Sequence, residues 1–166
     1  MTDIRIITVE TAEAVTLDWL LLPTGDLDTA SALATAATVA LCTDRRALDD
    51  DELPSLDENT DRRGWCGDTG AEEIWGGWPI GSRFWLLARE KITGPEAERG
   101  STLARVEDYA LEALLPFVGA GVASAVDVEA TRTALERIDC QAVIYRGNLP
   151  AIQLRFADLW NGIIRE

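Results

Sequence analysis

The C-terminal half of the chain changes its hydrophobic period, and this change constrains the fold more than any other feature. From about Ser101 to Leu115 apolar residues recur on one helix face, and Pro116 with the glycines after it is expected to stop the helix. Beyond Gly121, apolar and polar residues alternate in three segments, which is typical of half-buried strands. The apolar positions are Val122, Val126 and Val128, then Ile138, Cys140, Ala142 and Ile144, and then Ile152, Leu154 and Phe156. We therefore expect an α+β fold, with the long helix packed on one face of a C-terminal three-stranded antiparallel sheet and the other face wet.

The N-terminal part predicts two strands and a helix, and a long loop follows. The segments are Ile4 to Val9 and Val15 to Leu22 for strands, Pro23 to Asp26 for a turn, and Asp28 or Thr29 to about Asp44 for the helix. An ordered loop is expected from about residue 45 to residue 80, then a short helix from Ile80 to Ile92 with Ser82 as its N-cap. Arg146 to Pro150 predicts a turn in the sheet. At 166 residues, the whole chain is expected to form a single domain.

Composition restricts the classes of partner. The formal net charge of −14 argues against binding to nucleic-acid phosphates or anionic membranes, because both need clustered cations. The first residues show no signal peptide, and the longest apolar runs are too short to span a membrane. We expect a cytosolic protein that meets soluble protein partners. The three cysteines are an odd number at wide spacing, so neither a disulfide framework nor a cysteine metal site is expected.

Few residues suit catalysis or metal binding. The chain has no histidine, which removes the commonest general base and metal ligand. Carboxylate pairs such as Asp61 or Asp68 with Glu72 or Glu73 leave a glycosidase open, but a chain with 29 acidic residues produces such pairs by chance. Asp57, Asn59, Asp61 and Asp68 partly match a calcium loop that lacks its glycine and its final glutamate. We expect no cofactor and no metal, and these acids are expected to make loop hydrogen bonds.

The stretch from Thr43 to Lys91, called the Arg-Trp segment below, gathers the most unusual residues. It contains Trp65, Trp75, Trp78 and Trp85 among arginines and glycines, and Trp and Arg dominate the energetics of protein contacts. One interpretation is a loop that folds back onto its own domain, with Trp65 and Trp85 in the core. The other is that at least one Trp and one Arg face another subunit. Both can hold at once.

Several ordered motifs of this segment resemble a known family, the baseplate wedge proteins of Mu-like phages and prophages. The motifs are Leu41 to Ala47, Asp50 to Pro54, Asp61 to Asp68 and Ile80 to Thr93, with weaker likeness around Tyr109 to Leu114 and in the strands after Val122. The likeness therefore covers most of the chain. Cys66 stands where that family usually carries a second Trp, so position 66 is not expected to make an aromatic contact. The family in turn is similar to the small wedge protein of T4-type contractile tails.

The resemblance implies a structural, non-enzymatic subunit of a contractile-tail baseplate in the virion, assembled in the host cytoplasm as part of a hetero-oligomer. Its implied partners are the larger wedge proteins, the tail sheath protein, and tube or hub proteins, and its terminal strands are expected to start sheath assembly by strand addition. The partner-binding residues expected on these grounds are Arg45, Arg46, Arg62, Arg63, Trp65, Trp75, Trp78, Arg83, Trp85, Ile152, Leu154 and Phe156. The alternatives are a carbohydrate-binding or peptidoglycan-cleaving protein that uses the acidic, Trp-rich loop, and an acidic mimic of nucleic acid.

Overall fold

The computed structural model describes residues 6–10, 15–26, 32–54, 61–90, 101–134 and 137–156. The chain divides into two compact units, Met1–Val39 and Ala40–Glu166, and each is described by itself. The expectation of a single domain stays a prediction. Within the described ranges, no helix is both long enough and apolar enough to cross a membrane.

The first unit begins with a pair of antiparallel strands, β1 (Ile6–Glu10) and β2 (Val15–Trp19). We predicted that the second strand would reach Leu22, and this was wrong. Leu22 belongs to the turn instead, because its amide donates to Asp26 O (2.8 Å) and its carbonyl accepts from Gly25 N (2.8 Å). Gly25 has φ +86°, a conformation that glycine adopts without the steric penalty of a side chain.

Helix α1 (Ala32–Cys42) leads from the first unit into the second. The residues proposed to cap it, Asp28 and Thr29, lie outside the described residues. The helix ends two residues before the predicted Asp44, because Asp44 forms an isolated parallel bridge with Ser82. The chain has therefore left the helix to pair with a later segment.

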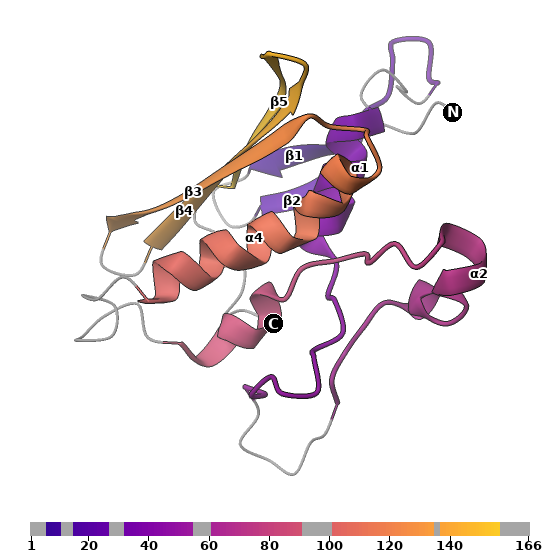
Figure 1. The fold of residues 1–166 in the computed structure, drawn as a ribbon. Helices are drawn as coiled ribbons and strands as arrows, with labels where there is room; N and C mark the ends of the chain where they lie inside the picture. Colours follow the sequence, from indigo (N-terminus) through magenta and orange to yellow (C-terminus); the bar gives the residue numbers. More distant parts are fainter. Residues whose placement is uncertain are drawn as a thin grey trace. The chain divides into compact units, whose positions relative to one another are not determined.

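In the second unit, helix α4 (Ser101–Gly119) packs on a three-stranded antiparallel sheet, mainly against its first strand (Figure 1). We predicted that Pro116, and then Gly119 and Gly121, would stop this helix; the helix continues through Pro116, and it ends at Gly119. Proline removes the amide that would donate to the carbonyl four residues earlier, but the helix still continues for three residues beyond it. Gly121 follows at φ +69°, after which the amides of Val122 and Ala123 both donate to the Phe117 carbonyl (2.9 and 3.0 Å).

The sheet has the order β3 (Ala125–Ala134), β4 (Arg137–Arg146) and β5 (Leu149–Phe156), so β4 is the central strand. Val126 lies opposite Ile144, and Ile144 lies opposite Ile152, which places the predicted apolar positions on one face. The turn is tighter than predicted, because Leu149 and Pro150 already belong to β5. An edge strand tolerates proline, since one of its sides needs no ladder partner.

The core of this unit lies between α4 and the sheet. The almost fully buried side chains between these two elements include Val106, Ala110 and Leu114 of α4 and Ile138, Cys140, Ala142 and Ile144 of β4. These are positions that the two hydrophobic periods predicted, and the α+β fold is confirmed.

Candidate functional site

The Arg-Trp segment is attached to the end of α1 by a parallel bridge between two chain segments, one at Asp44 and one at Ser82. Ser82 N donates to Thr43 O (2.8 Å), Arg45 N donates to Ser82 O (2.9 Å), and Ser82 Oγ donates to Leu41 O (2.7 Å). The prediction that Ser82 caps a helix was wrong, because its hydroxyl donates to the carbonyl of Leu41 instead. The helix expected there is a 3-10 helix, Phe84–Arg89, that starts after Arg83.

Gly81 is required where the two segments pair. Its φ is +101°, and a Cβ at this position would lie 2.6 Å from Thr43 O and 2.8 Å from Arg45 N. Both neighbours are backbone atoms, so they cannot move aside as the end of a flexible side chain would. The glycine allows the close approach on which the backbone hydrogen bonds of Ser82 depend.

Trp85 is a core residue of its own chain. Its side chain is almost fully buried, and its indole Nε1 donates to Arg45 O at 2.8 Å. The guanidinium of Arg63 lies 4.8 Å from the centre of the indole ring, and Arg63 Nη1 lies 2.5 Å from Asp44 Oδ2. The face of the Trp85 indole and the Asp44 carboxylate hold the guanidinium of Arg63 from two directions. Trp85 and Arg63 therefore contact their own domain, as in the first of the two interpretations above.

Arg83 joins the segment to α4. Its Nη1 donates to both carboxylate oxygens of Asp51 (2.7 and 2.8 Å), its Nε donates to Glu112 Oε2 (2.8 Å), and its guanidinium lies 4.8 Å from the Tyr109 ring centre. Arg45 Nη1 reaches the other oxygen of Glu112 at 3.1 Å. Burial alone would lower the pKa of Arg83, but the hydrogen bonds that Arg83 donates to Asp51 and Glu112 outweigh burial, so its pKa is raised. Sequence reasoning missed both acids, because the run from Asp49 to Glu52 is typical of a solvated charge cluster and Glu112 was placed outside the apolar face of the long helix.

Arg62 and two acids hold the loop around Trp65. The Arg62 guanidinium donates to the carbonyls of Leu48 and Asp49, and its own carbonyl accepts from Ala47 N at 2.9 Å. Asp68 Oδ2 accepts the amide of Trp65 at 3.0 Å, and Asp61 Oδ1 accepts the amide of Arg63 at 2.9 Å. These two carboxylates therefore make loop hydrogen bonds, while Asp57 and Asn59 lie outside the described residues.

The remaining tryptophans and Arg46 are closer to the surface. Trp78 is half-buried, with its ring edge-to-face on Phe117 (5.2 Å between centroids, 81° between planes). Trp65 is also half-buried, and Arg46 is exposed. The backbone of Trp75 ends the short helix α2 (Ala71–Trp75), and its side chain lies outside the described residues. Contact of these residues with another subunit stays a prediction.

The second predicted contact region is the outer strand of the sheet, β5. Ile152 and Leu154 are half-buried, since α4 packs mainly on β3, at the opposite edge (Figure 1). The backbone of Phe156 lies opposite Cys140, and its side chain lies outside the described residues. Among the helices that the structure describes, α4 covers the apolar face at β3 and not at β5 to the same extent.

The directions of the backbone amides follow from one hydrogen bond. Ala130 N donates to Glu107 Oε1 of α4 at 2.9 Å, so this amide points away from β4, toward the outer edge of β3. Ladder hydrogen bonds alternate along an antiparallel strand. Cys140, opposite Ala130, therefore directs its backbone groups to β5. The pairing of β4 with β5 is regular from Cys140 to Ile144, so the alternation continues along β5. It directs the amide of Gln153 away from β4, toward the outer edge of β5.

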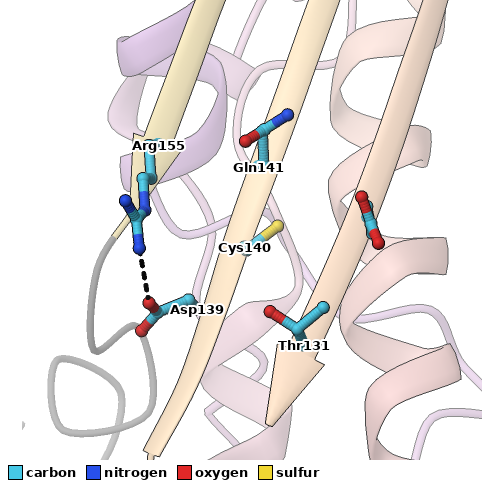
Figure 2. Close-up of a pocket in the computed structure, with 6 residues that line it drawn as sticks. Thr131, Asp139, Cys140, Gln141 and Arg155 are labelled. Atoms are coloured by element: carbon cyan, nitrogen blue, oxygen red, sulfur yellow. Dashed lines mark hydrogen bonds and ion pairs between the residues drawn. The ribbon is translucent and has the colours of Figure 1, made fainter. Parts of the chain in front are cut away.

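The face of the sheet opposite α4 holds a hollow of about 110 Å³ that sequence reasoning missed (Figure 2). We expected Asp139 on a wet face, and this was wrong, since it is only 5% exposed. Arg137 Nε donates to Asp139 Oδ1 (2.8 Å), and Arg155 Nη2 donates to Oδ2 (3.2 Å). A buried carboxylate needs such partners. The signal in the sequence was an arginine at the second position before Asp139 on the same strand face.

Comparisons with known proteins agree with the resemblance inferred from the motifs. Residues 33–149 match the family described as Phage protein GP46. The chain is 44% identical over 130 residues to the protein named baseplate protein gp46 of Escherichia phage Mu, an alignment that covers 78% of this chain and 77% of that protein. No solved structure matches. Since the family match extends over most of the chain and includes both the Arg-Trp segment and the first two strands of the sheet, this protein belongs to the GP46 family of phage proteins.

Proposed function

We propose that this chain is a non-enzymatic structural subunit of the baseplate of a contractile phage tail. The observation that carries the proposal is the 44% identity, over most of both chains, with a baseplate protein of phage Mu. A structural subunit acts through surfaces that fit its neighbours, and the described part of the chain offers two regions suited to that purpose. It is located in the tail baseplate of the virion, and the baseplate is assembled in the host cytoplasm.

The first region is the Arg-Trp segment, which would join the chain to larger wedge proteins and to tube or hub proteins. The buried Trp85 and the bridge from Arg83 to α4 fix this long loop to its own unit. The exposed Arg46 and the half-buried Trp65 are consequently presented on an ordered support. A loop that is already ordered pays less conformational entropy when a partner binds, which favours a tight interface.

The second region is the edge of β5, which would accept a strand from the tail sheath protein and so start sheath assembly. The outward amide of Gln153 and the half-buried Ile152 and Leu154 support this role. Strand addition gains affinity from main-chain hydrogen bonds and specificity from alternate side chains.

The carbohydrate-cleaving alternative has less support. Asp61 and Asp68, the acids that it needs, accept backbone amides of Arg63 and Trp65 and so have a structural use in the loop. A hydrolase would need one of them to move a proton at a sugar oxygen instead.

The test is co-purification with the neighbouring tail proteins of the same phage. The tagged chain, coexpressed with them, should retain wedge and sheath proteins. Gln153→Pro removes the outward donor of β5 and should reduce sheath retention at least tenfold, whereas the control Gln153→Val keeps the amide and should retain sheath. Trp65→Ala should reduce wedge retention only. Failure of the unaltered chain to retain any tail protein would refute the proposal.

A further inference from the structure

The two outer edges of the sheet differ in a way that the proposed function does not explain. At the β3 edge, the outward amide of Ala130 is already bound by the Glu107 carboxylate at 2.9 Å. At the β5 edge, the outward amides belong to residues remote from the main contact of α4. We infer that Glu107 closes the β3 edge to strand pairing, so that an added strand can join the sheet only at β5.

The chemistry of the closure follows from the position of the carboxylate. A strand that paired with β3 would place a carbonyl oxygen about 2.9 Å from the Ala130 nitrogen, which is where Glu107 Oε1 lies. The two oxygens cannot occupy the same place, so the carboxylate would have to leave the Ala130 amide before a strand could pair there. Exposed edges invite pairing between chains, and an inward-pointing charge is one of the devices that prevent it.

A hydrogen bond to a charged acceptor also makes this closure stronger than a neutral side chain would. Glu107 is half-buried, on the part of α4 that packs against β3. Displacing it would leave the half-buried carboxylate without its donor and the amide of the buried Ala130 without its acceptor, which costs free energy. A competing strand therefore has to offset that cost before it gains any pairing energy.

The same asymmetry specifies the kind of segment that β5 accepts, and this part of the inference rests on the proposed function. Side chains of the added strand on the α4 side would meet Ile152 and Leu154, so alternate positions should be apolar. On the other side the added strand would meet Arg155, whose side chain is 67% exposed, so an acidic or polar residue fits there. The expected partner is an extended segment with apolar and acidic or polar residues in alternation.

Hydrogen exchange of the isolated chain, followed by NMR, tests the closure without any partner. The amide of Ala130 should exchange about tenfold or more slowly than that of Val128, which points to the same edge by the alternation rule. Glu107→Ala should remove that protection at Ala130, whereas Glu107→Gln keeps an acceptor oxygen and should preserve most of it. Equal exchange of Ala130 and Val128 in the unaltered chain would overturn the inference, even if the alanine variant failed to fold.

Self-association gives the second measurement. In analytical ultracentrifugation, Glu107→Ala should form concentration-dependent dimers through its opened β3 edges, while the unaltered chain and Glu107→Gln remain monomeric. A monomeric Glu107→Ala with native circular dichroism would contradict the closure. Because both measurements use the isolated chain, their failure is distinct from failure of the proposed function, which would appear as loss of tail-protein retention.

Discussion

Gly81→Ala is the substitution that should show most clearly how the Arg-Trp segment is held. The new methyl carbon would lie 2.6 Å from Thr43 O, on a residue with φ +101°. Backbone strain of this kind costs about 1–3 kcal/mol. Separating the two segments would also weaken the two hydrogen bonds of the Ser82 backbone, at about 1 kcal/mol each. If both hydrogen bonds are lost, the free energy of unfolding should therefore fall by about 3–5 kcal/mol.

The matched control is Gly147→Ala in the turn between β4 and β5. Gly147 also has a positive φ, +68°, but a Cβ there would meet nothing within 4 Å. Its cost should be the conformational term alone, about 1–2 kcal/mol. Urea unfolding followed by tryptophan fluorescence measures both variants. Equal losses of stability in the two would refute the reasoning, because they would show that the close approach at Gly81 has no cost of its own.

Two further substitutions test the ion bridge and the buried thiol. Arg83→Met should lower the free energy of unfolding by about 2–4 kcal/mol, because it removes the partner of the little-exposed Asp51. Arg155→Met, at a side chain 67% exposed, should cost under about 1 kcal/mol, because Asp139 keeps its hydrogen bond from Arg137; similar urea midpoints for both variants would contradict the bridge. Burial first, and then the Glu107 charge, raise the pKa of Cys140 to about 12 from its ordinary 9.0, so the folded state keeps a proton that the unfolded state loses. Stability should therefore fall as the pH rises from 9 toward 12, and it should fall less steeply in Cys140→Ala; parallel pH profiles of urea midpoints would refute this assignment.

Hydrophobic period was sufficient to predict the α4 and sheet unit. Alternation placed Val126, Ile144 and Ile152 on one face, and the structure has them opposite one another across the three strands. Such patterns are local, and burial of one face enforces them. Local signals misjudged the ends of elements, as at Pro116, where the loss of one donor did not outweigh the continuing packing of Phe117.

The contacts of the Arg-Trp segment could not be predicted in the same way, because they join residues far apart in the sequence. The sequence marked Arg83 and Trp85 as unusual, but nothing local pairs Arg83 with Glu112 or Trp85 with the carbonyl of Arg45. Asp51 was assigned to a solvated run of acids for the same reason. Which tryptophans face a partner depends on chains outside this one, so the sequence could suggest that role only through its likeness to a family.

The central claim is that this chain is a built-in part of a contractile-tail baseplate. Quantitative mass spectrometry of purified tail particles from the phage or prophage that encodes it tests the claim most directly. We predict that the chain is present in a fixed ratio to the other baseplate proteins and is retained after the particles are washed at high salt. Its absence from intact, contractile particles would contradict the account.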